Sequence, residues 1–242
     1  MIKKVEGIVI REIPFKNTSK IITLLTKEYK TVSVIAKGAK QIKSKLRTNT
    51  IPFTYGFFHM YYKEEGLSTL ISVDVEDYFL TLKQDIKVYG YACYVTDIAH
   101  QVLKQDYDQQ IYQLYINTLI KLNEKFNPSI ITNIFMMQIL NNLGIAPVID
   151  NCVKCFSEDI ITFSVDSGGS LCDKCLGEER IISEKSLKLM RMFLHVDIAK
   201  ISKLDIKDYL AKEINLYLDL YFDKYSGLYL KSKKNLEMLT TV

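Results

Sequence analysis

Two cysteine pairs constrain the fold of this chain more than any other feature of its sequence. Four of the five cysteines lie in "CVKCFSEDIITFSVDSGGSLCDKC", residues 152–175, as two CxxC pairs separated by 16 residues. Such an arrangement can form disulfides, a redox centre, a catalytic metal site or a structural metal site. The choice decides whether the segment performs chemistry or holds the fold together.

The spacing of the pairs favours zinc. The N-terminal "MIKKVEGIVIREI" has no signal-peptide pattern, so we expect a cytoplasmic protein whose thiols stay reduced. A thioredoxin-like redox motif has a single CxxC, whereas CxxC–x16–CxxC falls in the range of zinc sites. Gly168 and Gly169 supply permissive backbone before the second pair. We predict one Zn²⁺ per chain, bound by Cys152, Cys155, Cys172 and Cys175.

Four thiolates complete a tetrahedron and leave no open position for water, so we expect a structural site and not a catalytic one. Such an insert can act as a fold staple or as a docking surface for DNA or protein. The flanking residues are acidic, which disfavours contact with a DNA backbone and favours the staple: Asp150, Glu158, Asp159 and Asp166.

The hydrophobic pattern predicts a β-domain followed by helices. Five short runs rich in β-branched and aromatic residues lie within residues 5–75, a number and size that suit a closed barrel of the OB-fold type. After Asp85 the apolar period becomes helical, in residues 84–105, 109–126, 128–144, 183–201 and 205–225. Asn127, Pro128 and Gly144 are start and stop signals of the third helix.

The expected fold class is therefore α+β with several domains. We predict a five-stranded OB-fold-like barrel in residues 1–80 and a helical bundle in 81–150 and 179–242. A zinc ribbon or knuckle with four cysteine ligands is inserted between the two helical parts, in 151–178. No apolar run approaches the roughly 20 residues that span a bilayer, so we expect no membrane partner.

Positive charge is concentrated in the N-terminal part of the chain. From Lys30 to Lys63 there are seven basic residues and no acidic one. Such a segment can track a phosphate backbone, or it can be a solvated lysine face. The segment "AKGAKQIKSKLR" places its cations in a loop that leaves the predicted barrel: Lys37, Lys40, Lys43, Lys45 and Arg47.

Aromatic and histidine residues give a weaker signal. The run "FTYGFFHMYY" could stack on bases, but alternation sends Phe58 and Met60 to one face and Phe57, His59 and Tyr61 to the other, and one face must fill the barrel. We expect the three histidines to be isolated structural residues. The chain contains none of the motifs GxxxxGK[ST], GxGxxG, GxSxG or HExxH, which favours a binding protein over an enzyme.

Several motifs in order resemble one family along nearly the whole chain. They are "GIVIRE", "AKGAK" followed by "KSK", "PF" at 52–53, "GIAPVIDNCVKC", "SGGSLCDKC" and "LYLKSKKNL". The sequence resembles the bacterial RecO family of DNA repair and recombination mediators. It departs from the family pattern at Phe156, where glycine is usual after the second cysteine, at Thr50 and Ile51, and in a basic loop richer in lysine than in arginine.

The resemblance implies a function without catalysis. RecO-like proteins bind single- and double-stranded DNA, anneal complementary strands, pair with RecR, engage the C-terminal tail of single-strand binding protein and help to load RecA. On this basis we expect a cytoplasmic protein that associates with the nucleoid during repair. The loop cations are expected to contact the DNA backbone, with a second basic patch at Lys231, Lys233 and Lys234.

Three other functions remain open on the sequence. The chain could be a zinc-ribbon regulator that uses its barrel on RNA. It could be a zinc enzyme with an open coordination position. It could also be an assembly adaptor whose lysines never meet nucleic acid.

Overall fold

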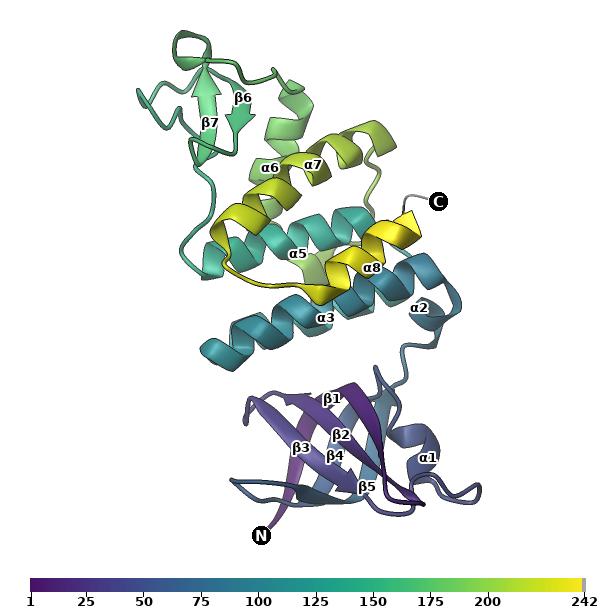
Figure 1. Cartoon of the computed structure of the whole chain (residues 1–242). Helices are drawn as coiled ribbons and strands as arrows, with labels where there is room; N and C mark the ends of the chain where they lie inside the picture. Colours follow the sequence, from purple (N-terminus) through teal and green to yellow (C-terminus); the bar gives the residue numbers. More distant parts are fainter. Residues whose placement is uncertain (241–242) are drawn as a thin grey trace. The chain divides into compact units, whose positions relative to one another are not determined.

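The computed structural model describes residues 1–240 (Figure 1). The chain divides into two compact units, one covering Met1–Leu119 and the other beginning at Ile120. Within the described residues no helix is both long and apolar enough to cross a membrane.

A closed barrel forms most of the first unit. Its strands follow one another around the barrel in the order β1-β2-β3-β5-β4, with β3 and β5 parallel and the other strand pairs antiparallel. Closure leaves no long edge strand exposed. The predicted five-stranded OB-fold-like barrel is therefore confirmed, in the strands β1 (Ile2–Phe15), β2 (Ser19–Thr26), β3 (Thr31–Ala36), β4 (Tyr55–Tyr61) and β5 (Ser68–Asp77).

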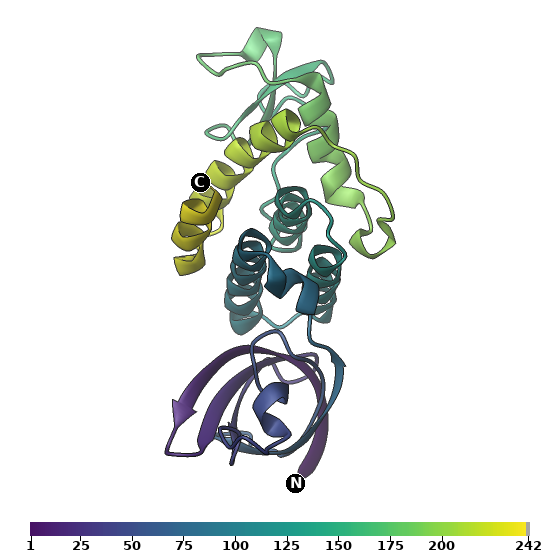
Figure 2. The ribbon, with the colours of Figure 1, turned by 90° about the vertical axis from the view of Figure 1, so that its right-hand side faces the viewer.

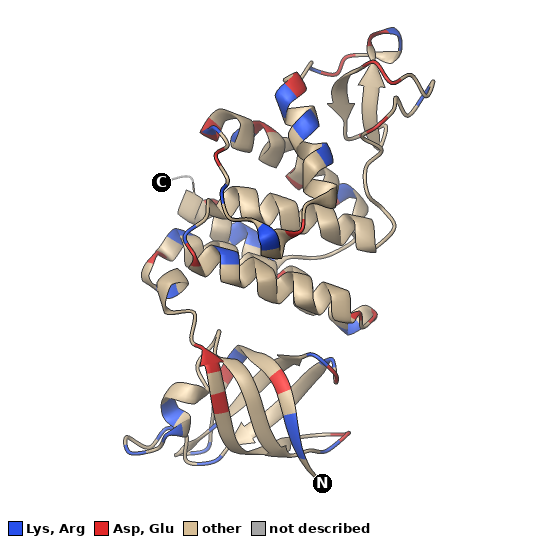
Figure 3. Cartoon of the chain, turned by 180° about the vertical axis from the view of Figure 1, so that it is seen from behind, with Lys and Arg blue, Asp and Glu red and all other residues tan. Residues whose placement is uncertain are grey.

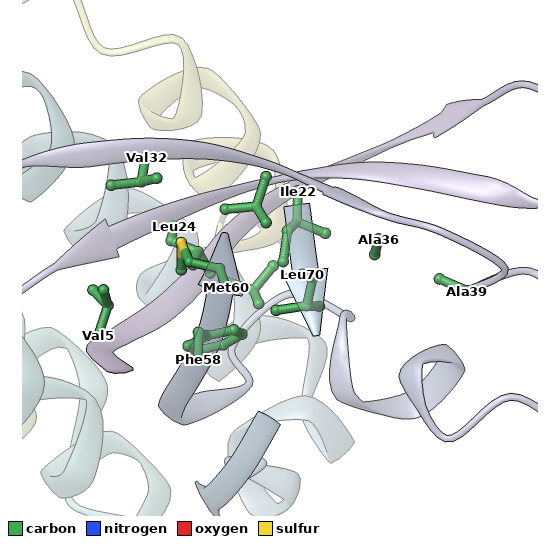
Figure 4. Close-up of a cluster of buried hydrophobic side chains, with 11 residues drawn as sticks. Val5, Ile22, Leu24, Val32, Ala36, Ala39, Phe58, Met60 and Leu70 are labelled. Atoms are coloured by element: carbon green, nitrogen blue, oxygen red, sulfur yellow. The ribbon is translucent and has the colours of Figure 1, made fainter. Parts of the chain in front are cut away.

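Alternating side chains fill the barrel, as Figure 4 shows for its core. Phe58 and Met60 of β4 are fully buried there, together with Ile22 and Leu24 of β2. The neighbouring β4 residues point outward, and Tyr61 is 54% exposed. The predicted two faces of β4 are thus found, with the apolar face inside.

One helix lies between two strands of the barrel along the chain and three follow it, the last of them running past the end of the first unit at Leu119. These are α1 (Leu46–Asn49), seen across the barrel opening in Figure 2, α2 (Leu80–Gln84), α3 (Ile86–Gln105) and α4 (Gln109–Asn123). Asp85 caps α3 by accepting hydrogen bonds from the backbone N–H groups of Lys87 and Val88. The rings of Phe53 and Tyr89 meet edge to face at 5.4 Å between centroids, which fixes α3 on the barrel.

The second unit is built around α5 (Pro128–Asn142), which is buried along most of its length. It packs against α6 (Glu184–His195) and α7 (Asp208–Tyr225), and α8 (Lys231–Thr240) follows. Asn127 caps α5, Pro128 is its first residue, and Gly144 follows its end with φ +71°, as the sequence predicts. Between α5 and α6 the chain forms a hairpin of β6 (Ile160–Ser164) and β7 (Gly169–Cys172).

Some elements differ from the expectation. The helical run expected over 183–201 ends at His195 and is followed by a short 3-10 turn, Ile198–Lys200, which Asp197 caps. The structure also contains elements that the sequence analysis did not name individually. These are the short helices α1 and α2, the β6–β7 hairpin and the helix α8. The division at 80, 150 and 178 stays a prediction.

Candidate metal centre and nucleic-acid interface

The β6–β7 hairpin brings the two cysteine pairs together. Cys172 ends β7, and a one-turn 3-10 helix, Asp173–Cys175, turns the chain so that the second pair shares one side. The first pair is tied to β7 because the N–H of Val153 donates to the carbonyl of Ser170 at 2.9 Å. The first turn closes on itself through a bond from Phe156 N–H to the Cys152 carbonyl, also 2.9 Å.

The four sulfurs fit a tetrahedral metal ion. All four Sγ atoms lie within 4.8 Å of one another, and those of Cys155 and Cys172 are 3.4 Å apart. A tetrahedron with bonds of about 2.3 Å has sulfur–sulfur edges of about 3.8 Å. The four cysteines predicted from the spacing therefore lie close enough to hold one metal ion. The identity of that ion as zinc stays a prediction.

Backbone donors prepare the first cysteine for a cation. Burial raises the pKa of Cys152, but backbone N–H groups of Cys172, Cys155 and Lys154 donate to its sulfur and bring the pKa down to about 6. Hydrogen bonding to the sulfur of Cys155, together with burial, raises the pKa of Cys175 to about 12. The site thus stabilises one thiolate by itself, and a bound cation would stabilise the remaining ones.

The insert is fastened to the helices of its own unit. Tyr225 of α7 donates its hydroxyl to the Val165 carbonyl at 2.9 Å, and the ring of Phe163 lies 5.8 Å from that of Tyr221. Two of the acidic flanks form ion pairs, Asp150 with Arg191 at 2.7 Å and Asp166 with Lys224 at 2.6 Å. These ion pairs are exposed and add little stability, so the tyrosine and phenylalanine contacts are the main attachment of the insert to α7.

Two glycines allow the close approach at the hairpin. Gly168 has φ +83°, in the left-handed region that favours glycine. A Cβ atom on Gly169 would lie 2.2 Å from the carbonyl oxygen of Val148, where the incoming chain bridges to β7. Phe156 also has a left-handed φ of +62° and is 77% exposed. Phenylalanine therefore occupies a backbone conformation that glycine adopts without strain.

A basic loop leaves the barrel after β3. Ala39 is fully buried in the barrel core and anchors the loop, while successive turns are held by bonds such as Gln41 N–H to the Gly38 carbonyl at 3.0 Å. All five predicted cations are exposed, and none takes part in the ion pairs found within residues 1–240. Figure 3 shows the blue cluster on this loop and α1. These cations are Lys37, Lys40, Lys43, Lys45 and Arg47.

The β1–β2 turn adds a cation that the sequence reasoning missed. Lys16 lies in this turn, is exposed and has φ +51°. The turn is joined to the basic loop because the N–H of Lys40 donates to the Thr18 carbonyl at 2.8 Å. In the sequence, Lys16 is a single lysine that lies 21 residues before the first cation of the loop. Only the pairing of the barrel strands brings it near the loop. We call these six residues, the five cations of the loop and Lys16, the basic rim.

The second basic patch is partly used within the protein. Lys231, Lys233 and Lys234 lie in α8, where Lys231 and Lys234 are exposed. The ammonium of Lys233 pairs with Asp223 of α7 at 2.6 Å, and its side chain is only 18% exposed. Two cations are therefore free for a phosphate backbone, compared with six at the basic rim.

The aromatic run of β4 offers little stacking surface. Phe53 and Phe58 are buried, Tyr55 donates its hydroxyl to Glu6 at 2.8 Å, and the ammonium of Lys4 covers the ring of Phe57 at 4.4 Å. Tyr61 alone among the aromatic residues of this run is strongly exposed.

The expectation that His59 is isolated was wrong. Its Nε2 lies 2.8 Å from an Asp74 oxygen, and this hydrogen bond lowers the pKa of Asp74. Lys4 reaches the same carboxylate at 3.6 Å, so the cluster neutralises itself on the outer face of the barrel. His100 is half-buried, and burial together with Lys104 lowers its pKa.

Comparison with known proteins places these features in one family. The family model described as Recombination protein O N terminal matches residues 1–79, and Recombination protein O C terminal matches residues 83–234. The DNA repair protein RecO of Halalkalibacterium halodurans is 33% identical over an alignment that covers all of this chain and 97% of that protein. The DNA repair protein RecO of Bacillus subtilis is 34% identical, over all of this chain and 96% of its own length. A third, from Listeria monocytogenes, is 34% identical over 96% of this chain and 92% of its own. The chain belongs to the RecO family of DNA repair proteins.

Proposed function

We propose that this chain is a DNA recombination mediator that binds single- and double-stranded DNA through the basic rim. The observation that carries the proposal is the set of six exposed cations on the β1–β2 turn, the loop after β3 and α1, none paired with a carboxylate among the described residues. Cations of this kind release counterions from a phosphate backbone when they bind it. Lysine side chains provide point charges, so binding is expected to be largely independent of base sequence along most of the strand.

Annealing follows from charge screening, and the proposed function includes no catalytic step. Two complementary strands held on one basic surface lose much of their mutual repulsion and meet at high effective concentration. The proposed partners are RecR, single-strand binding protein and, indirectly, RecA, which the family resemblance implies. The proposed location is the cytoplasm, with association to the nucleoid during repair.

A cleft in the second unit suits the acidic, apolar tail of single-strand binding protein. It has a volume of about 350 Å³ and lies between α6 and the start of α7. Its apolar floor includes Leu189 and Leu210, and its rim carries Lys185, Lys188 and Lys207. A labelled tail peptide is expected to bind the wild type and to bind Lys185→Ala/Lys207→Ala several-fold more weakly. Equal affinity for the two proteins would reject this cleft as the site.

Zn²⁺ is the ion we propose for the cysteine centre, one per chain, in a structural role. The proposal is supported by four thiolate ligands, which zinc prefers, and by a ligand set that fills a tetrahedron. The ion pairs and aromatic contacts that fix the insert on α6 and α7 support a stapling role.

The rate of strand annealing tests the proposed function. Two complementary labelled strands are mixed with the wild type, with Lys40→Ala/Lys43→Ala/Lys45→Ala, or with a control that removes three exposed lysines of the second unit, Lys185, Lys203 and Lys212. We expect the wild type and the control to speed annealing without any nucleotide, and the loop variant to lose most of the effect.

Three results would contradict the proposal. Equal acceleration by the loop variant would reject the basic rim as the binding surface. Tighter binding of RNA than of DNA of the same sequence would favour the RNA regulator. No binding of either nucleic acid would leave an assembly adaptor.

A further inference from the structure

A cavity of about 340 Å³ lies between the barrel and α3, entirely within the first unit. One wall is formed by Arg11 of β1 and Phe53, which follows α1. Tyr89, Asp97 and His100 of α3 form the other. The volume is in the range of sites that hold a small ligand or part of a larger one. The basic rim does not include any of these residues, so the cavity is a separate feature.

Two backbone irregularities meet at this wall. The pairing of β1 with β2 shifts between Val9 and Arg11, which is a β-bulge at Ile10, and bulges change the direction of the neighbouring side chains. Phe53 is buried and has φ +64°, a conformation that costs free energy for a bulky residue. Its N–H donates to the Val9 carbonyl at 2.8 Å, so the strained residue is fixed directly beside the bulge. Such features are frequent at binding sites.

The cavity combines aromatic rings with one cation and one anion. The half-buried ring of Tyr89 lines the cavity as an apolar surface, and it packs edge to face against the buried ring of Phe53. Arg11 is exposed and belongs to none of the ion pairs found within residues 1–240. Asp97 is held in place on α3 by the amide of Gln101 at 2.9 Å. Its carboxylate can accept hydrogen bonds, and the guanidinium of Arg11 can only donate them.

We propose that this cavity binds a guanine base turned out from a single strand of DNA, an inference that rests on the proposed DNA-binding function. Guanine is the DNA base whose Watson–Crick edge places two N–H donors side by side, which matches the two oxygens of one carboxylate. Its O6 and N7 acceptors are the groups that arginine binds most often in DNA. Unstacked bases are commonly held against aromatic side chains in this way.

The position of the cavity suits a strand that the basic rim has bound. Arg47 of the rim and Pro52 of the cavity wall are five residues apart along the chain. Five residues span at most about 18 Å, so the phosphate contacts and the cavity are within reach of one short strand. The rim would thus supply affinity, and the cavity would supply a preference for one base.

Oligonucleotides that differ in one base test the proposal. Binding of a 15-residue oligothymidine is compared by fluorescence anisotropy with the same strand carrying one central guanine or one central adenine. We expect the guanine strand to bind the wild type about tenfold more tightly than the other two, in keeping with the discrimination that one bidentate contact provides. Asp97→Asn is expected to abolish this preference without weakening the binding of oligothymidine.

A matched control removes the same charge outside the cavity. Asp106 is exposed at the C-terminal end of α3, and Asp106→Asn is expected to keep the guanine preference. Equal binding of all three strands by the wild type would overturn the proposal while leaving the proposed function intact. The proposal would also be overturned if adenine and guanine raised the affinity equally. The same holds if the Asp97→Asn variant still bound the guanine strand more tightly than the other two. Failure to bind any strand would reject the proposed function and this inference together.

Discussion

At the scale of single residues, Phe156 is the strained position of the cysteine centre. Its φ of +62° costs a non-glycine residue about 1 kcal/mol or more, and its ring is largely exposed, so removing the ring loses little burial. We therefore expect Phe156→Gly to raise the free energy of unfolding of the second unit by about 0.5–1 kcal/mol. Thermal unfolding of the metal-loaded protein measures the change.

A second substitution at the same position separates backbone strain from the loss of the ring. Phe156→Ala removes the ring but keeps a Cβ atom and hence the strain. It is expected to leave the melting temperature nearly unchanged. If alanine and glycine stabilise the protein equally, the left-handed conformation is not the source of the effect.

Asp219 of α7 makes stability depend on pH. Burial raises its pKa to about 6, with Asp223 adding to the shift and Lys233 opposing it. The unfolded value is about 3.9, so the folded state holds an extra proton between about pH 4 and pH 6. Burying the ionised Asp219 carboxylate therefore lowers the free energy of unfolding by its full amount above about pH 6. This destabilisation disappears as the pH falls toward about 4.

Replacing Asp219 by asparagine tests this linkage. Asp219→Asn is expected to raise the free energy of unfolding by about 1–2 kcal/mol at pH 7 and by almost nothing at pH 4. Asp205→Asn, at an exposed aspartate of the same unit, is the control and should change stability little at either pH. Urea denaturation at both pH values gives the comparison. A gain at pH 4 as large as that at pH 7 would contradict the assignment.

Residue-scale features were predictable from sequence where they depend on local spacing. The CxxC pairs, the cap at Asn127 and the left-handed Gly144 follow from residues within a few positions of one another. The pairing of His59 with Asp74 depends on the register of β4 and β5. That register brings together two residues that are 15 positions apart in the sequence. No local pattern carries that information, and the same holds for Lys16 beside the basic loop.

At the scale of elements, the β6–β7 hairpin depends on close packing at Gly169. A Cβ atom there would meet the backbone of Val148 at 2.2 Å, and backbone cannot move aside as a flexible side chain can. We expect Gly169→Ala to destabilise the second unit by about 1–3 kcal/mol and to speed the loss of metal to a chelator. Ser167→Ala, in the turn that precedes β7, serves as the control and should behave like the wild type. An alanine variant with wild-type stability would mean that the bridge to Val148 is dispensable.

Elements with a strong apolar period were predictable, and those without one were not. The β-strands of the barrel and the helices α3, α4, α6 and α7 each bury a regular set of side chains, whereas α5 is apolar and buried along most of its length. Helix α8 buries only Leu236 among its described residues, so its sequence reads as a charged segment. The β6–β7 hairpin is short, and its small core consists of Leu171 with two cysteines, so we expect its formation to depend on the turns that carry the cysteine pairs. The cavity beside α3 depends on a bulge, which hydrophobic alternation does not reveal.

At the scale of the whole molecule, the chain forms two compact units, and the four clustered cysteines belong to the second. Removing the ion with a strong chelator should therefore lower the melting temperature of the second unit by several degrees. The affinity of the barrel for single-stranded DNA is expected to stay the same. Calorimetry and DNA binding on the same metal-free sample measure both quantities. If the melting temperature of the second unit is unchanged after the loss of the metal has been verified, the stapling role is contradicted.

The most direct test of the central claim is the salt dependence of binding to single-stranded DNA. With six cations on the basic rim, the plot of log Kd against log salt concentration should have a slope of about 4, and removing Lys40, Lys43 and Lys45 should reduce it to about 2. The control variant that lacks Lys185, Lys203 and Lys212 should keep the wild-type slope. No binding at low salt, or the same slope for the loop variant and the wild type, would contradict the account.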